Sequence, residues 1–255
     1  MNSNNVEKQY NSMSYFYNVL YSGCDMRDYE NEFIDEYKDL FDNLQPNAKV
    51  LDSSCGNGIQ ATALKRCGID ITATDISEEM INLTRQYAKD NHLSFPTKRL
   101  GWEELPNNFG EDFDIVFCYG NSICHSANET EMLKNIMSLY KVTKKGGKIV
   151  IDTRNWDKVL NDRIRFNTSD VKSYEGKKYI FTYIWNLNNF DEHNDVEILF
   201  TEIINDKETK SIPSKLDFTP FRHADFIARL KKCYLKIMKD TFQFDHDNYS
   251  ITLEK

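Results

Sequence analysis

The sequence predicts an α/β protein in which a doubly wound, Rossmann-like parallel sheet carries a β-rich antiparallel insertion. Up to residue 154, apolar runs with strand character alternate with helical segments, which is the pattern of parallel strands joined by crossover helices. After Arg154, β-rich runs follow one another with little helix between them, as in an antiparallel sheet. We therefore expect an N-terminal helical cap at 1–45, a core at 46–157 and 221–255, and an insertion at 158–220 that covers the site.

The elements of the expected core follow in order. Residues 29–44 place apolar side chains at spacings of three and four, which predicts a helix that Pro46 ends. Gly68 is a plausible C-cap for the next helix, and Ser77 is a plausible N-cap for the one after it. Strands are expected at 49–52, 70–75, 113–119 and within 144–154, and helices at 59–67, 78–91 and 128–143.

The C-terminal part is predicted to be mostly β-structure. Three runs at 177–187, 195–205 and 214–221 are expected to form an antiparallel sheet, because polar turn segments separate them. A helix is expected at 223–238 and a final strand at 248–255.

Composition narrows the classes of partner. The 255 residues have a formal charge of −8, and an acidic surface repels the phosphates of nucleic acid. The chain has no apolar run long enough to span a membrane, and the first ten residues show no signal-peptide pattern. Six scattered cysteines without a C-x-x-C pair are expected to be reduced thiols. We expect a cytoplasmic monomer or homo-oligomer with a small-molecule substrate, and no metal ion.

A glycine motif marks the expected ligand site. The stretch 56–61, GNGIQA, fits the G-x-G-x-x-A fingerprint, and Asp75 ends the following strand, where an acid can bind ribose hydroxyls. Asp52 precedes Gly56 by four residues, and a carboxylate there would repel a pyrophosphate. The combination favours a cofactor with no phosphate and a positive amino group, such as S-adenosylmethionine. A bland alternative is that Asp52 only caps a turn.

Several segments together resemble a known family. They are VLDSSCGNG (50–58), FYNVLYSG (16–23), LGWEEL (100–105), CYGNSICH (118–125), GGKIVIDTRNW (146–156) and, more faintly, LDFTPFRHADF (216–226). The first resembles the leading motif of class I S-adenosylmethionine-dependent methyltransferases. The set as a whole is similar to glycine N-methyltransferase and glycine/sarcosine methyltransferases, which also carry a β-rich insertion after the fifth strand.

The resemblance implies a role for each cofactor residue. Asp75 would hold the ribose, Asp52 would lie near the amino end of the cofactor, and Trp102 would cover the adenine edge. Arg27 would pair with the methionyl carboxylate. The full set implied to surround S-adenosylmethionine is Tyr21, Arg27, Asp52, Cys55, Gly56, Gly58, Asp75, Ile76, Met80, Gly101, Trp102, Tyr119 and Gly120.

The resemblance also implies the acceptor residues. Tyr21, Asn121 and Arg154 would carry the reaction, with Asn121, Arg154 and Tyr183 binding the acceptor. Arg154 would grip an amino-acid carboxylate with its planar fork and aim a neutral amine at the methyl group. Because methyl transfer is an in-line displacement, alignment is the main requirement and no general base is expected.

Departures from the family pattern leave the acceptor open. Pro220 and Phe221 stand where the family tends to carry tyrosines, Tyr10 matches the arm tyrosine only loosely, and His125 is expected to be a packing residue. Three functions therefore remain at this point. They are methylation of glycine or a methylated glycine, methylation of another small acceptor such as an amino sugar or a carboxylic acid, and oxidoreduction with NAD.

Overall fold

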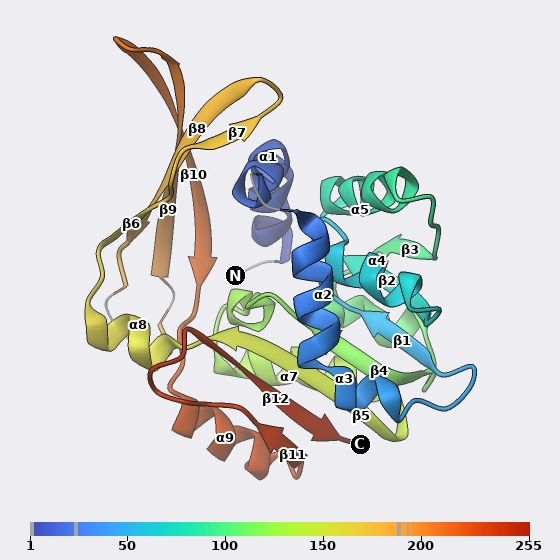
Figure 1. Ribbon diagram of the computed structural model, residues 1–255. Helices are drawn as coiled ribbons and strands as arrows, with labels where there is room; N and C mark the ends of the chain where they lie inside the picture. Colours follow the sequence, from blue (N-terminus) through green and yellow to red (C-terminus); the bar gives the residue numbers. More distant parts are fainter. Residues whose placement is uncertain (1–2, 23–24, 188–189, 193) are drawn as a thin grey trace.

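The computed structural model describes residues 3–22, 25–187, 190–192 and 194–255. A seven-stranded sheet in the order β11-β12-β5-β4-β1-β2-β3 forms the centre (Figure 1). The strands β1 to β5 run parallel, whereas β12 is antiparallel to both β5 and β11. Their bounds are β1 Lys49–Asp52, β2 Asp70–Asp75, β3 Thr97–Arg99, β4 Phe113–Cys118, β5 Thr143–Arg154, β11 Lys236–Asp240 and β12 Asn248–Glu254.

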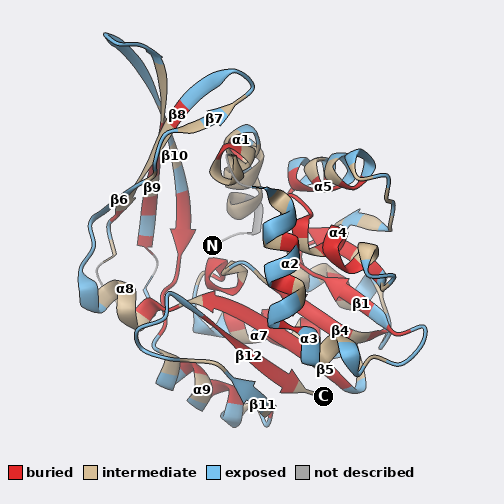
Figure 2. Ribbon diagram, in the orientation of Figure 1, coloured by how far each residue is buried: buried red, intermediate tan, exposed pale blue. Residues whose placement is uncertain are grey.

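The central strands of the sheet are buried on both faces, which explains their apolar character, whereas the edge strand β11 is mostly exposed (Figure 2). Successive residues contribute to opposite cores: Leu51, Val116 and Ile149 belong to one cluster, and Val50, Ile115 and Val150 belong to the other. The helices of the described chain are α1 Ser3–Tyr21, α2 Met26–Glu36, α3 Lys38–Asp42, α4 Ile59–Arg66, α5 Glu78–Asp90, α6 Leu105–Asn108, α7 Glu129–Val142, α8 Trp156–Asp162 and α9 His223–Lys232, with 3-10 turns η1 Trp102–Glu104 and η2 Ser122–His125.

A separate antiparallel sheet rises beside the core (Figure 1). It contains β6 Phe166–Thr168, β7 Lys172–Tyr174, β8 Lys177–Trp185, β9 Asn194–Asn205 and β10 Glu208–Phe218. The predicted fold class, a Rossmann-like sheet with a β-rich insertion, is confirmed. The expected third strand at 214–221 begins earlier, because the polar residues from Glu208 onward pair with β9 in an exposed hairpin.

Two predicted helices are shorter than expected. The segment 29–44 is divided at Tyr37, which ends α2 and starts α3. The segment 223–238 stops at Lys232, because Tyr234 adopts a left-handed φ of 58° and Leu235 bonds back to the carbonyl of Leu230. The chain then enters β11.

Helix α1 lies between the antiparallel sheet and α5 (Figure 1). On the sheet side, Phe16 stacks on Phe200 of β9 with ring centroids 4.4 Å apart, and Gln9 donates to the Asp217 carboxylate at 2.7 Å. On the core side, the amide oxygen of Asn11 accepts a hydrogen bond from Ser77 at 2.6 Å. Helix α1 therefore connects the two sheets and brings its own side chains to the space between them.

Candidate active site

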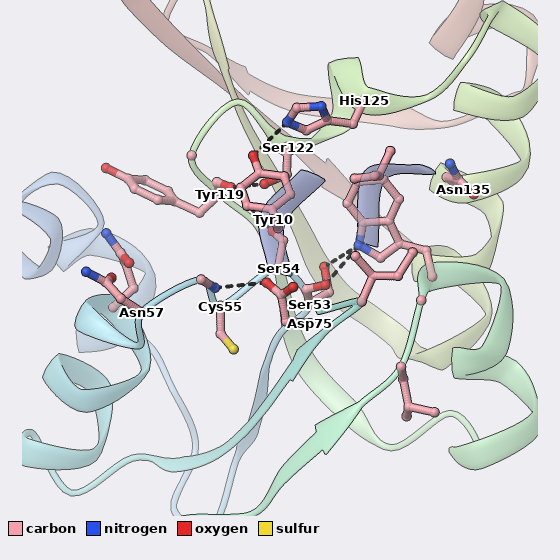
Figure 3. A pocket seen from close by; sticks show the side chains of 18 of the residues that line it. Tyr10, Ser53, Ser54, Cys55, Asn57, Asp75, Tyr119, Ser122, His125 and Asn135 are labelled. Atoms are coloured by element: carbon pink, nitrogen blue, oxygen red, sulfur yellow. Dashed lines mark hydrogen bonds between the residues drawn. The ribbon is translucent and has the colours of Figure 1, made fainter. Parts of the chain in front are cut away.

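A cavity of about 950 Å³, counting its open mouth, lies at the carboxyl ends of β1, β2 and β4. Ligands of open α/β sheets bind at this edge, where strand order reverses between β1 and β4. Nine of the predicted cofactor residues line the cavity, several of which Figure 3 labels: Tyr21, Cys55, Gly56, Asp75, Ile76, Gly101, Trp102, Tyr119 and Gly120.

Asp75 is fixed by the backbone of the glycine loop. Its two carboxylate oxygens accept hydrogen bonds from the amides of Gly56, at 3.0 Å, and Ser77, at 2.9 Å. Burial raises the pKa of Asp75 to about 6, although these backbone donors oppose the shift. Each oxygen keeps accepting capacity toward the cavity, which suits the vicinal hydroxyls of a ribose.

The two motif glycines serve different purposes. A side chain at Gly56, which has a φ of 52°, would meet the Tyr17 hydroxyl at 3.3 Å beside the cavity. A side chain at Gly58, with a φ of 86°, would instead meet Cα of Thr84 at 2.9 Å. Gly58 does not line the cavity, so its requirement comes from the close packing of α4 on α5.

Three buried carboxylates lie at or near the carboxyl ends of β1, β2 and β5. Burial raises the pKa of Asp52 to about 7, that of Asp75 to about 6 and that of Asp152 to about 7. Asp52 leaves Oδ2 buried and without a hydrogen-bond partner in the part of the chain that the structure describes. This edge therefore favours a ligand with cationic groups over one with a pyrophosphate, as S-adenosylmethionine requires.

Trp102 forms one wall of the cavity. Its indole Nε1 donates to the backbone oxygen of Ser53 at 2.9 Å and to the Ser53 hydroxyl at 3.2 Å, which fixes the ring. Ile76 lines the cavity as well. A fixed aromatic ring beside an aliphatic side chain provides the flat apolar surface on which an adenine packs.

Helix α1 supplies a row of tyrosines that the sequence interpretation mostly assigned to the core. Val6, Tyr10, Tyr17 and Tyr21 line the cavity, and their spacings of four and seven place them on one face of the helix. Only Tyr21 was predicted. The signal that could have found Tyr10 and Tyr17 is this helical spacing from Tyr21. Burial raises the pKa of all three phenols, so their hydroxyls stay protonated.

Tyr10 and His125 form a hydrogen-bonded chain with a fixed direction. Nδ1 of His125 lies 2.7 Å from the Asp217 backbone oxygen, which can only accept, so Nδ1 carries the proton. Burial lowers the pKa of His125 to about 4, so the ring is neutral and Nε2 accepts from the Tyr10 hydroxyl at 2.8 Å. The Tyr10 oxygen consequently offers lone pairs to the cavity (Figure 3). His125 was expected only to pack, yet it also lines the cavity.

The predicted acceptor residues gather at the end of β5, outside the cavity lining. Asn121 uses its side-chain oxygen to accept from the Arg154 amide at 3.0 Å, so it fixes the strand end. The Arg154 guanidinium carbon lies 4.8 Å from the ring centre of Trp185, on which Tyr183 stacks at 5.3 Å. Within the described residues Arg154 has no ion pair, and its Nε is buried without a hydrogen-bond partner. The fork is therefore available for an anionic ligand.

Other predicted residues also lie away from the cavity. Arg27 has a side chain 47% exposed and pairs with Glu30 at 3.8 Å. Met80 is fully buried in the core, and Asp52 lies beneath the loop that lines the cavity. The structure thus does not bring Arg27 to the site as the resemblance implied.

The sequence interpretation did not single out several polar residues that line the cavity. They are Ser53, Ser54, Asn57, Gln60, Glu103, Ser122, Glu131 and Asn135. Ser53, Ser54 and Asn57 flank the motif glycines, so their position in the loop was an available signal. Glu131 and Asn135 come from α7, which no local motif connects to the site.

The cysteines of the described chain form no disulfide, and its residues offer no cluster that could bind a metal ion. The described cysteines are free, and Cys24 lies outside the described residues. Cys55 lines the cavity, but burial raises its thiol pKa, which argues against a nucleophilic role. Within the described ranges, no cluster of His, Cys, Asp and Glu could hold a metal ion, and none of the helices is long and apolar enough to cross a membrane.

Comparison with known proteins identifies the class. Residues 50–147 match the model of a methyltransferase domain family. Residues 50–147 therefore carry a methyltransferase domain, and the fold and the donor set of the cavity agree with the S-adenosylmethionine-dependent class. The predicted resemblance, enzyme class and cofactor are confirmed at that level, and the NAD alternative loses its support.

The particular relatives are more distant. A glycine/sarcosine N-methyltransferase of Aphanothece halophytica is 28% identical over 154 residues, which cover 52% of this chain and 58% of the relative. The chain spans less than two thirds of the length of such curated relatives. An S-adenosylmethionine-dependent methyltransferase from Clostridium acetobutylicum has a TM-score of 0.72 at 16% identity, covering 96% of this chain and 98% of that one. A sugar N-methyltransferase from Streptoalloteichus has a TM-score of 0.64 at 16% identity, covering 91% and 88%.

Proposed function

We propose that this protein is an S-adenosylmethionine-dependent N-methyltransferase that acts on the amine of glycine or of a methylated glycine, sarcosine or dimethylglycine. The observation that carries the proposal is the Arg154 fork at the carboxyl end of β5, which has no carboxylate partner in the described chain. An amino-acid carboxylate would complete it. The glycine/sarcosine relatives support the same class of acceptor.

The residues divide into two groups by charge. Asp52, Asp75 and Asp152 lie at or near the carboxyl ends of three strands, and each carries a negative charge when it is ionised. Arg154 provides positive charge at the end of β5, next to Asp152 in the sheet. A zwitterionic amino acid could place its carboxylate at Arg154 and direct its amine toward the carboxylate-lined cavity. The two ends of the acceptor would thus be distinguished electrostatically.

The chain assists transfer mainly by alignment. S-adenosylmethionine supplies an electrophilic methyl group on a sulfonium, and Asp75, Trp102 and Ile76 would hold its nucleoside. Arg154 would hold the acceptor so that the amine lies in line with the methyl carbon. The Tyr10 oxygen, whose own proton is committed to His125, can accept a hydrogen bond from the amine and orient it. The amine must lose its proton before attack, so we expect the rate to rise with pH.

A methyl-transfer screen tests the proposal. Tritium-labelled S-adenosylmethionine is incubated with glycine, sarcosine, dimethylglycine and glucosamine, and labelled products are separated and counted. We expect label on glycine or a methylated glycine. Label on none of these, with S-adenosylhomocysteine binding intact by calorimetry, would reject the acceptor class and keep the cofactor assignment.

A second candidate acceptor is an amino sugar. It is supported by the fold shared with a sugar N-methyltransferase, which covers 91% of this chain. It is also supported by Pro220 and Phe221, which replace tyrosines of the glycine-type pattern. Glucosamine in the screen distinguishes this candidate from the first: label on glucosamine and not on glycine would select it.

The oligomeric state, the lack of nucleic-acid binding and the cytoplasmic location stay predictions.

A further inference from the structure

The unpaired arginines of this acidic protein gather in one place. Ion pairs with carboxylates occupy six arginines, namely Arg27, Arg66, Arg85, Arg99, Arg222 and Arg229. In the described part of the chain, Arg154, Arg163 and Arg165 have no such pair. All three lie around Trp185: its ring centre is 4.8 Å from the Arg154 guanidinium carbon, and the other two share a cavity with it.

That second cavity measures about 1290 Å³, including open solvent. Most of its lining comes from α8, the segment that follows α8 and the end of β8; Figure 1 shows α8 at the foot of the antiparallel sheet. Its charged lining consists of Arg163, Arg165 and Arg222, and its apolar lining includes Leu160, Trp185 and Phe190. It shares no lining residue with the cofactor cavity. Cationic forks beside aromatic rings are the donor set for a phosphate or carboxylate attached to an apolar body.

The local backbone holds these arginines in place. Arg163 caps α8 in a left-handed conformation with a φ of 51°, so the chain turns sharply there. The backbone oxygen of Arg165 accepts from the Trp185 amide at 2.9 Å, which fixes it beside the ring. Arg222 lies 4.0 Å from the Phe190 ring centre and 3.8 Å from the Asp157 carboxylate. Asp157 already accepts the His223 amide at 2.8 Å, so it neutralises the cavity only in part.

We propose that this cavity binds the anionic end, a phosphate or carboxylate, of a further methyl acceptor that is larger than glycine and is methylated in addition to it; that the occupant is an acceptor rests on the proposed function. Trp185 supports the connection, since it is only 4% exposed and contacts both the cavity and the Arg154 clamp. A molecule that places its amine and carboxylate near Arg154 could extend past this ring to Arg163 and Arg165.

Binding is tested first, without any turnover. Phenyl phosphate, benzoate and neutral phenol are titrated by calorimetry into the wild type, into an Arg163→Gln/Arg165→Gln variant, and into a Lys178→Gln/Lys210→Gln variant. The last pair removes the same charge from exposed sites on the same sheet. We expect phenyl phosphate or benzoate, but not phenol, to bind; the arginine variant should bind at least tenfold more weakly and the lysine variant normally. Which anion binds more tightly separates phosphate from carboxylate.

Saturation with S-adenosylhomocysteine should leave this binding unchanged, because the two cavities are separate. No binding of either anion, equal binding by the arginine variant, or competition with S-adenosylhomocysteine would overturn the site.

Transfer is tested next with matched acceptors. Rates of labelled-methyl transfer are compared for tyrosine with O-phosphotyrosine and for glucosamine with glucosamine 6-phosphate. We expect the phosphate to raise kcat/KM by at least tenfold in one pair, and the advantage to vanish in the Arg163→Gln/Arg165→Gln variant alone. No phosphate advantage in either pair, with glycine methylated, would overturn the acceptor assignment. Failure of the proposed function differs, since it would appear as no transfer to any amine while phenyl phosphate still binds.

Discussion

The strands β2 and β5 both end in a charged residue at the same edge of the sheet, but they end in different surroundings. Asp75, at the end of β2, accepts hydrogen bonds from the backbone amides of Gly56 and Ser77. Arg154, at the end of β5, has aromatic rings from α8 and β8 around it and no ion pair among the described residues. Asp75 therefore has its backbone donors in place without a ligand, whereas the Arg154 guanidinium has no carboxylate partner among the described residues.

The difference explains how each side can vary. A carboxylate fixed by main-chain donors depends on a loop conformation, which many sequences share when they bind the same nucleoside. An arginine set among side chains of an insertion can receive different anions as those side chains change. We infer that the cofactor side identifies the class of enzyme and the β5 side determines its acceptor.

The largest expected effect comes from the β5 side. Arg154→Lys keeps the charge and loses the planar fork, so we expect kcat/KM for glycine or sarcosine to fall about 100-fold, or about 2.7 kcal/mol. Affinity for S-adenosylhomocysteine should stay the same, because other residues hold the cofactor. Steady-state kinetics and calorimetry of the same preparation measure both. Arg85→Lys, an exposed arginine in an ordinary ion pair, is the control. An unchanged kcat/KM would show that the Arg154 fork does not bind the carboxylate of the acceptor.

The next effect falls on the β2 side. Asp75→Asn removes the charge that accepts two backbone amides and is expected to accept ribose hydroxyls. Affinity for S-adenosylhomocysteine should fall by about 1–3 kcal/mol, or about 5- to 150-fold. Asp70→Asn, at the exposed start of the same strand, should bind normally. Calorimetric titration measures both, and normal binding by Asp75→Asn would exclude it from the site.

Gly58 tests whether the cofactor side depends on backbone packing. Gly58→Ala combines a left-handed φ with a methyl group 2.9 Å from the Thr84 main chain, so we expect a loss of about 1–3 kcal/mol in the free energy of unfolding. Gly146→Ala has a similar φ of 80° with nothing within 4 Å, and isolates the conformational cost. Urea unfolding measures both. Equal losses would mean that the contact with Thr84 contributes nothing.

The smallest expected effect is a pH dependence of cofactor affinity. Below pH 6 the Asp75 carboxyl is mostly protonated, since its pKa is raised to about 6, and Asp52, raised to about 7, is protonated too. A cationic ligand binds the ionised forms, so affinity for S-adenosylmethionine should rise about fourfold or more from pH 5.5 to pH 8. Calorimetry at both pH values measures this, and Asp75→Asn, which removes the group that titrates near pH 6, should flatten the profile. A flat wild-type profile would contradict the assignment.

The same carboxylates affect stability in the opposite direction. Their folded-state pKa values lie above the unfolded value of about 3.9, so the folded state binds more protons between pH 4 and 7. Their contribution to the free energy of unfolding is complete below pH 4 and is lost as pH rises through 6 to 7. Ligand-free protein should thus lose this part of its stability over the range in which it gains affinity for the cofactor.

Local patterns in the sequence pointed to some of the residues that line the cavity. Asp75 ends one predicted strand and Gly56 follows another, and alternation along the strands predicted the sheet, because these signals lie within a few residues of one another. The place of Trp102 came from the resemblance. Tyr10 and His125 meet across 115 positions, and Asn135 reaches the cavity from α7. Such pairings depend on how helices pack, which a single sequence does not reveal. The position of Arg27 was carried over from a resemblance, and here the residue pairs with Glu30.

The most direct test of the account compares glycine with glycinamide as methyl acceptors for the wild type and for Arg154→Lys. The two acceptors present the same type of amine and differ in the carboxylate. Each kcat/KM is first corrected for the fraction of the amine that is neutral. If Arg154 holds that carboxylate, the corrected wild-type kcat/KM should be about 100-fold higher for glycine than for glycinamide. The variant should lose this preference while methylating glycinamide normally. Equal kcat/KM for both acceptors in the wild type, or an equal loss on both in the variant, would contradict the claim that the β5 side recognises an amino-acid carboxylate.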